Sequence, residues 1–150
     1  TLEPTLPGWM SHTKPYAFDT SPIERSIGAG RFMNGTPAIP ALFACGPGLK
    51  IISEIGVEAI RSNSIRQTQH LIDASDKHGW KVNTPRDDGT RGGTVSIMVP
   101  DCENVSRELL ARDILIDFRP GAGIRLSPHF YTTNDEMDHA IETISEIVAG

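Results

Sequence analysis

The stretch that decides the fold is Asp117-Phe118-Arg119-Pro120-Gly121-Ala122-Gly123-Ile124-Arg125-Leu126-Ser127-Pro128-His129-Phe130-Tyr131. Apolar and polar side chains alternate over residues 114–118, which predicts a β-strand that runs into a turn. Proline fixes φ and glycine permits positive φ, so Pro120-Gly121-Ala122-Gly123 predicts a hairpin turn. A second short strand follows over residues 124–127.

Arg125 stands alone as a charged residue on this second strand. Successive side chains of a strand point to opposite faces, so Ile124 and Leu126 share one face and Arg125 occupies the other. An arginine on a short strand beside a tight loop is suited to binding a carboxylate with both prongs of its guanidinium. A structural ion pair is the alternative, and this stretch alone does not separate the two.

The patterns around the hairpin predict an α/β chain with an α+β small domain. Apolar residues recur at helical spacing from about 49 to 78, with Gly79 as the expected C-cap. We also expect strands at 80–82 and 94–99 and helices at 101–112 and 134–148, with Asp101 and Asn134 as N-caps. The prediction is a long linking helix, then a mainly antiparallel sheet of about four short strands with helices on one face.

The first 40 residues differ from the rest. They are rich in Pro, Gly, Ser and Thr and carry scattered aromatic residues, namely Trp9, Tyr16, Phe18 and Phe32. A long irregular segment with large apolar groups is expected to pack against another surface. A short helix should begin at Ile39 and stop at Gly46-Pro47-Gly48. We therefore expect residues 1–48 to form an interface segment and residues 49–150 to form a C-terminal small domain with its linker helix.

The composition limits which partners and which kinds of site we expect. The chain of 150 residues has a net charge of -5 and no cluster of basic residues, which argues against a nucleic-acid partner. It shows no apolar run of membrane-spanning length and no signal peptide, so we expect no membrane partner. Two cysteines cannot make a disulfide framework, which favours a reducing, cytoplasmic location. No Cys/His spacing fits a zinc site.

Three further motifs could carry chemistry. Trp9 and His12 lie within one turn of each other, which fits either a binding motif or a packed tryptophan beside a surface histidine. Thr36 precedes Pro37 and a helical pattern, so it is a candidate for either an N-cap or a phosphate-binding hydroxyl. Arg91 precedes two glycines at the start of a strand, a common position for an arginine that faces a ligand.

Together these motifs resemble the C-terminal half of kynureninase-like class V aminotransferases, which are fold-type-I pyridoxal-phosphate enzymes. The resemblance runs from about residue 6 to residue 148. Its marks, in chain order, are Gly8-Trp9-Met10-Ser11-His12, Arg31-Phe32, Gly35-Thr36-Pro37, Gly56-Val57, Ile60-Arg61, Arg91-Gly92-Gly93, Arg119-Pro120-Gly121-Ala122-Gly123-Ile124-Arg125 and Ser127-Pro128-His129-Phe130-Tyr131. Their order and spacing together make chance unlikely to explain them.

The resemblance implies roles for four residues. Trp9 and Thr36 match positions that reach the phosphate of pyridoxal phosphate in the neighbouring subunit of a homodimer. Arg125 matches the arginine that binds the α-carboxylate of the amino-acid substrate, and His12 lies in the region that approaches the substrate ring. The resemblance also implies that the N-terminal segment packs on a large domain and on a partner subunit.

One departure from the family is serious. The lysine that binds the cofactor lies in the family's large domain, upstream of the Gly-Trp motif, and no lysine of this chain has the matching context; the lysines are Lys14, Lys50, Lys77 and Lys81. Such enzymes need that amine. The chain alone should therefore be inactive, and it would act with an upstream large domain or a companion chain that completes the cofactor site. Transamination and kynureninase-type hydrolysis both stay open.

A hypothesis from a different class is a non-catalytic domain that binds an amino acid or another small carboxylate. The order of strands and helices after Gly79 resembles small ligand-sensing α/β modules. Arg91 and Arg125 would then hold the ligand without any cofactor. The missing lysine favours this hypothesis, whereas it gives no purpose to the motifs at Trp9 and Thr36.

Overall fold

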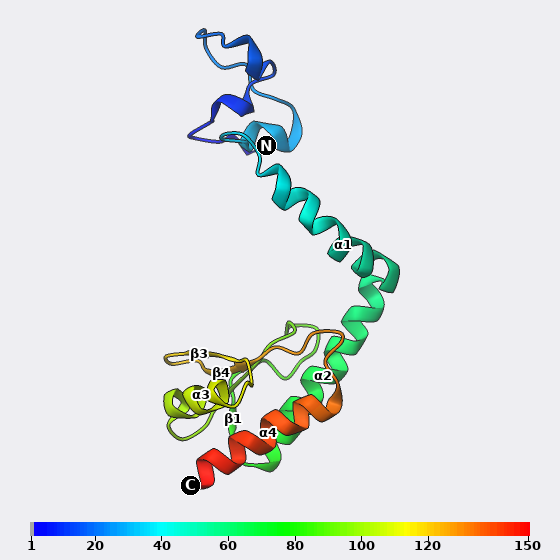
Figure 1. Ribbon diagram of the computed structural model, residues 1–150, viewed down its shortest axis with the longest axis vertical. Helices are drawn as coiled ribbons and strands as arrows, with labels where there is room; N and C mark the ends of the chain where they lie inside the picture. The colour runs from blue at the N-terminus through cyan, green and yellow to red at the C-terminus, as the bar shows by residue number, and fades with distance from the viewer. Residues whose placement is uncertain (1) are drawn as a thin grey trace. The chain divides into compact units, whose positions relative to one another are not determined.

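The computed structural model describes residues 2–150. The chain divides into two compact units, one that ends at Ile51 and one that runs from Ile52 to Gly150. Figure 1 shows the irregular N-terminal part, the two consecutive helices and the α/β part in chain order. The first unit carries the motifs of Trp9, His12 and Thr36, and the second carries Arg125.

The first unit has an irregular but ordered backbone. It contains three short 3-10 helices, which are η1 (Trp9–Ser11), η2 (Pro15–Ala17) and η3 (Gly28–Phe32). An antiparallel bridge joins His12 to Arg25. On either side of this bridge, the Thr13 amide donates to the Glu24 carbonyl at 2.9 Å and the Ser26 amide donates to the Ser11 carbonyl at 2.8 Å. Backbone hydrogen bonds between distant residues therefore give this segment a defined path without regular secondary structure.

Helix α1 (Ile39–Ile55) begins where the sequence predicts but does not stop at Gly46-Pro47-Gly48. The predicted stop is wrong, because the helix continues with Pro47 inside it. Proline removes one backbone donor, and the bonds on either side of it hold the helix here. The helix also begins three residues after Thr36, so Thr36 does not cap it.

Helix α2 (Val57–Lys77) follows directly, so the single helix expected from about 49 to 78 is in fact two. The break falls at Gly56, whose φ of +88° cannot continue a right-handed helix. At the other end Gly79 has a φ of +70°, the conformation of a glycine that closes a helix. Among residues 2–150 no single helix is long and apolar enough to cross a membrane, although α1 and α2 satisfy that test of length and composition as a bent pair.

Four strands form one antiparallel sheet in the order β1-β2-β4-β3. The strands are β1 (Lys81–Val82), β2 (Val95–Met98), β3 (Asp117–Arg119) and β4 (Gly123–Leu126). The hairpin between β3 and β4 forms as predicted, with Gly121 at a φ of +80° and Gly123 at +95°. A Cβ at Gly123 would lie 2.1 Å from the carbonyl oxygen of Ile97, so glycine is what lets β4 lie this close to β2.

The first hairpin strand is shorter than the alternation over 114–118 predicts. It pairs with β4 only from Asp117 to Arg119. Continuing the register would set residues 114–116 against residues 126–128, where Pro128 has no amide hydrogen to donate. The apolar residues of this segment serve packing instead, since Ile114 and Ile116 lie against the hydrophobic core.

Two helices complete the second unit, and their N-caps differ in how well the sequence predicts them. Helix α3 (Cys102–Ala111) is capped by Asp101, as expected, whose carboxylate accepts from the Asn104 amide. Helix α4 (Asn134–Ala149) is capped by Thr133 and not by Asn134. Thr133 and Glu136 form a reciprocal capping box, which satisfies two backbone donors where Asn134 would satisfy one.

Helices α2, α3 and α4 pack on one face of the sheet (Figure 1). The core between them consists of alternate strand residues and the inner faces of the helices, chiefly Leu71, Ile72, Val95, Ile97, Val105, Leu109, Ile124, Leu126, Ile141 and Ile144. The predicted fold class is therefore confirmed: an α/β chain whose C-terminal part is an antiparallel sheet with helices on one face. Residues that alternate with the core positions, including Ser96 and Arg125, lie on the opposite face of the sheet.

Candidate functional site

Arg125 lies in the middle of the sheet on the face without helices. Strand β4 places it opposite Ser96 of β2 on one side and opposite Asp117 of β3 on the other. Its side chain is 39% exposed, and its Nη2 donates to the Asp117 carboxylate. Its Nε is buried and has no hydrogen-bond partner among residues 2–150. The guanidinium is thus held at one nitrogen and keeps donors that its neighbours do not satisfy.

Asp117 accepts hydrogen bonds from two arginines. Its Oδ2 receives the bond from Arg125 and a second bond from the Nε of Arg119 at 3.1 Å. The hydrogen bond from Arg125, followed by the charge of Arg119, lowers the pKa of the Asp117 carboxyl below its ordinary value of 3.8. Asp117 is therefore ionised at neutral pH. The sequence does not single it out, because a cross-strand pair requires the register of the hairpin.

Arg91 does not face a ligand, contrary to the interpretation of its motif. It is 4% exposed and donates into helix α2 and its own loop. Its acceptors are Oγ1 of Thr68 at 3.1 Å, Oε1 of Gln69 at 2.9 Å and the carbonyl of Arg86 at 2.5 Å. Arg91 is therefore a structural residue that ties the loop before β2 to α2. This removes one of the two arginines on which the ligand-sensing hypothesis relied.

Helix α2 also fixes the motif that follows β4, through amide side chains that the sequence does not single out. The Nε2 of buried Gln67 donates to the carbonyls of His129 and Thr132, each at 2.9 Å. The Nδ2 of Asn63 donates to the Phe130 carbonyl at 3.1 Å. The His129 side chain is exposed. The motif is held by its backbone, and the rings of His129, Phe130 and Tyr131 pack against one another.

In the first unit, Trp9 and Thr36 come from motifs that the fold brings together. A Cβ at Gly8 would lie 1.8 Å from the Asn34 carbonyl oxygen, so glycine permits the contact between the two motifs. The Nε1 of Trp9 comes to 4.0 Å from the position of a Cβ on Gly35, the residue before Thr36. Trp9 and Thr36 are both exposed. The Trp9 indole N–H therefore lies beside the segment that contains Gly35 and Thr36.

His12 lies one turn beyond Trp9 and is half-buried. Its Nδ1 accepts the backbone N–H of Lys14 at 2.8 Å. Beside it is a hollow of about 510 Å³ whose lining includes Trp9, Phe18 and Lys14. Because Nδ1 is an acceptor, a neutral His12 carries its proton on Nε2 and offers an N–H donor.

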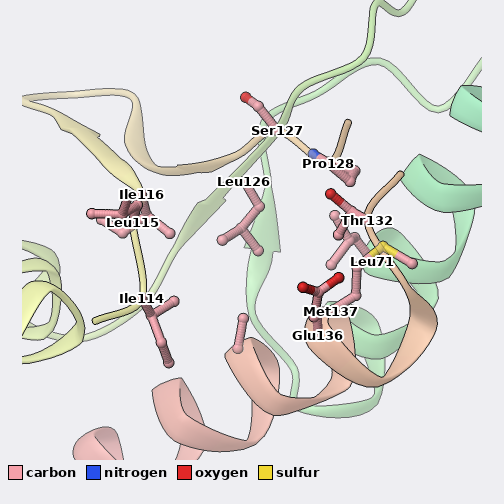
Figure 2. A pocket seen from close by; sticks show the side chains of 11 residues that line it. Leu71, Ile114, Leu115, Ile116, Leu126, Ser127, Pro128, Thr132, Glu136 and Met137 are labelled. Atoms are coloured by element: carbon pink, nitrogen blue, oxygen red, sulfur yellow. The ribbon is translucent and has the colours of Figure 1, made fainter. Parts of the chain in front are cut away.

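A separate apolar hollow of about 160 Å³ lies beside the end of β4 (Figure 2). Figure 2 shows Ile114 and Ile116 on one side of it, Leu126 behind it, and Met137 with Glu136 on the other side. Since Leu126 faces the core, this hollow lies on the helix side of the sheet and Arg125 points away from it. This apolar hollow is therefore separate from the expected carboxylate-binding residue Arg125. Among residues 2–150 no group of three or more acidic, His or Cys side chains is arranged to bind a metal.

Comparison with curated proteins finds relatives along almost the whole chain. Kynureninases are 30% identical in Geobacillus thermodenitrificans, 27% in Bacillus thuringiensis subsp. konkukian and 31% in Shouchella clausii. Each match covers 97% of this chain and 35% of the relative. The chain thus spans about a third of the length of the curated relatives it matches.

Solved structures share the fold at lower identity. A cysteine desulfurase from Thermococcus onnurineus NA1 matches with a TM-score of 0.79 and 22% identity, covering 99% of this chain and 40% of that chain. The cystine C-S lyase C-DES, solved with its product cysteine persulfide, matches with a TM-score of 0.76 and 18% identity, covering 95% and 38%. The family model of the kynureninase C-terminal domain matches residues 60–144. Because this is more than half of the chain, the protein belongs to the kynureninase C-terminal domain family, among the kynureninase-like class V pyridoxal-phosphate enzymes.

Proposed function

We propose that this chain is the C-terminal part of a pyridoxal-phosphate enzyme that cleaves a C–C bond of an amino acid by kynureninase-type hydrolysis. The observation that carries the proposal is the position of Arg125, a partly exposed guanidinium in the middle of the open sheet face. The curated relatives, all named kynureninase, favour hydrolysis over transamination.

Arg125 is proposed to bind the α-carboxylate of the substrate. Its Nη2 is already oriented by Asp117, and no acceptor among residues 2–150 engages its Nη1. A carboxylate approaching the open face would meet two parallel N–H donors of one planar group, which fixes direction as well as distance. Binding at this end of the amino acid would orient the bonds at its Cα.

Trp9 and Thr36 fit the phosphate of pyridoxal phosphate. Both are exposed, and the contact of Gly8 with Asn34 presents the indole N–H beside the Thr36 segment. An indole N–H and a hydroxyl can each donate a hydrogen bond to a phosphate oxygen. The cofactor, when bound, supplies an electron sink for bonds at the Cα of the substrate. None of the four lysines is assigned to it, so the amine would come from an upstream large domain or a companion chain.

His12 is proposed to face the ring of the substrate. Its Nδ1 is engaged by the Lys14 amide, so its free Nε2–H could donate to an oxygen of the substrate side chain. The neighbouring hollow has aromatic walls from Trp9 and Phe18, whose rings are nearly parallel at 14° with centroids 6.2 Å apart. Flat apolar walls beside a few polar groups, which include His12 and Lys14, favour a ring that carries polar substituents.

Residues 1–48 are proposed to belong to the interface with a large domain and with a second subunit of a homodimer. Helix α1 buries none of its residues within this chain, although Leu42, Phe43 and Leu49 are each more than 60% exposed. A helix that is apolar on all sides is normally enclosed by other protein. Both cysteines are free, which is consistent with the cytoplasmic location we propose.

The test uses the full-length protein that carries this chain, supplied with pyridoxal phosphate and kynurenine, the amino acid after which the relatives are named. We expect a visible absorbance band from the bound cofactor and hydrolytic release of alanine. A folded protein that binds the cofactor but converts kynurenine to a keto acid only with an amino acceptor would show transamination instead. Calorimetric titration of this chain alone with amino acids should show no tight binding, because tight binding without cofactor is what the ligand-sensing hypothesis requires.

A further inference from the structure

We infer that Arg119 is a positioning residue for the carboxylate site: it offsets the charge of Asp117, so that Asp117 can orient Arg125 without cancelling its charge. This inference rests on the proposed function, because it concerns the affinity of Arg125 for a substrate carboxylate. Arg119 acts through Asp117 and need not touch the substrate.

The register of the hairpin creates this arrangement. Asp117 lies directly opposite Arg125 on the neighbouring strand, and Arg119 lies two residues after Asp117 on the same face of β3. Both guanidinium groups donate to one atom, Oδ2 of Asp117. Opposite Arg119 the partner position is Gly123, which has no side chain to compete for this space.

Arg125 needs an orienting partner. Its Nε is buried without an acceptor, and Ser96 on its other side uses its hydroxyl to donate to the Ala122 carbonyl at 2.6 Å. Among residues 2–150, Asp117 is the acidic side chain that pairs with Arg125. A freely rotating arginine would lose side-chain entropy when it binds a ligand, and a fixed one has already lost it.

An orienting carboxylate also has a cost. An isolated pair of Asp117 and Arg125 has no net charge, so a substrate carboxylate would be attracted by one group and repelled by the other. With Arg119 included, two positive groups share one negative group and the cluster keeps one positive charge. The Arg119 side chain is 63% exposed, so solvent screens its effect and the expected change in affinity is small.

The experiment compares variants of the full-length enzyme in steady-state kinetics at low and high salt. We expect Arg119→Gln to raise KM about two- to five-fold at low salt, with little change in kcat and a smaller effect at high salt. Arg119→Lys should restore most of the affinity, because it keeps the charge. Arg107→Gln, which removes an equally charged and exposed side chain from α3, is the matched control and should leave KM unchanged.

A double-mutant cycle separates action through Asp117 from direct contact with the substrate. In an Asp117→Asn background, Arg119→Gln should raise KM by less than it does in the original sequence, because Asp117 no longer holds the Arg119 guanidinium beside Arg125. An effect of undiminished size in this background would overturn the inference. The inference would also be overturned if Arg119→Gln left KM unchanged while Arg125→Lys raised it. If Arg125→Lys itself leaves KM unchanged, Arg125 does not bind the substrate carboxylate, and the result contradicts the proposed function.

A second readout needs only this chain. Carbon-detected NMR can follow the titration of the Asp117 carboxyl in the original sequence and in Arg119→Gln. We expect the titration midpoint to rise in the variant, because one of the two positive neighbours is removed. An unchanged midpoint would show that Arg119 does not interact with Asp117 in solution, and this would overturn the inference independently of any activity.

Discussion

The Nε of Arg91 donates a hydrogen bond to Oγ1 of Thr68 across 3.1 Å, and this bond joins the loop before β2 to helix α2. Thr68 is fully buried and Arg91 is 4% exposed, so the contact lies inside the second unit. Arg61 reinforces it from the helix side, since its Nη2 donates to the carbonyls of Asp88 and Arg91. Arg91 thus donates from the loop to the helix, and Arg61 donates from the helix to the loop.

We predict that Arg91→Met destabilises the second unit by about 2–4 kcal/mol. The substitution keeps a long apolar stem but leaves the buried Thr68 hydroxyl without this donor, together with acceptors on the exposed residues Gln69 and Arg86. Urea unfolding followed by the fluorescence of Trp80 measures the loss. Arg107→Met is the matched control and should change stability by less than about 0.5 kcal/mol. An equally small effect of Arg91→Met would contradict the structural role.

We predict that Arg125→Lys lowers the affinity of the full-length enzyme for its amino-acid substrate by roughly ten- to a hundred-fold. Lysine keeps the charge but loses the two-pronged contact, which is worth on the order of 1.5–3 kcal/mol. Thermal unfolding of the variant should remain close to that of the original protein. The reverse outcome, a lower melting temperature with unchanged affinity, would mean that Arg125 serves only its ion pair with Asp117.

We predict that neutral His12 carries its proton on Nε2. The reason is that Nδ1 accepts the Lys14 amide at 2.8 Å and so cannot also hold a proton. Nitrogen-15 NMR of the ring distinguishes the two tautomers directly. A ring proton on Nδ1 at neutral pH would rule out the proposed donor role of His12.

We predict that the chain loses stability in acid as three carboxyl groups become protonated. A hydrogen bond from Arg125 lowers the pKa of Asp117, and one from Arg86 lowers the pKa of Asp76, each below the ordinary value of 3.8. A hydrogen bond from the Thr133 amide lowers the pKa of Glu136 below its ordinary value of 4.5. Because each pKa is lower in the folded chain than in the unfolded chain, this stability is present above those ordinary values. This stability is lost as the pH falls through the lower pKa values that these groups have in the folded chain.

Melting temperatures measured from about pH 7 to pH 2 check this acid response. They should fall mainly below about pH 4. Glu136→Gln should flatten part of the fall, because glutamine keeps the capping box but does not titrate. Glu103→Gln, in the first turn of α3, is the comparison variant. A decline that begins near pH 6 would point to histidines instead.

We predict that the chain on its own self-associates or is cut by proteases within residues 1–38. Tyr16 and Phe18 are 71% and 75% exposed, and Ile27 is 95% exposed. Apolar surface of this extent normally marks an interface. Size-exclusion chromatography and limited proteolysis test the prediction. A monomer that resists cleavage throughout residues 1–38 would show that the segment does not need another surface.

Patterns in the sequence were sufficient for the class of fold and for the position of Arg125. Alternation around Pro120-Gly121-Ala122-Gly123 predicts the hairpin, and the pleat alone sets Arg125 apart from Ile124 and Leu126. These features depend on neighbours within a few residues, so they can be derived without the tertiary structure. The same holds for the Asp101 cap of α3, which is a matter of one side chain and one helix turn.

Contacts between distant residues decided what the sequence could not. The motif of Arg91 fits a ligand-facing arginine and a buried one equally well, and only the packing of α2 against the loop selects burial. Pro47 predicts the end of a helix, whereas Gly56 predicts only a local weakening. In the structure helix α1 continues through Pro47, and the break between α1 and α2 falls at Gly56. Asp117, Arg119 and Arg125 form one cluster because strand register joins positions that are separated along the chain. Packing therefore decides Arg91 and strand register decides the cluster, whereas helix α1 buries no residue and its break at Gly56 follows from the local backbone, whose φ is +88°.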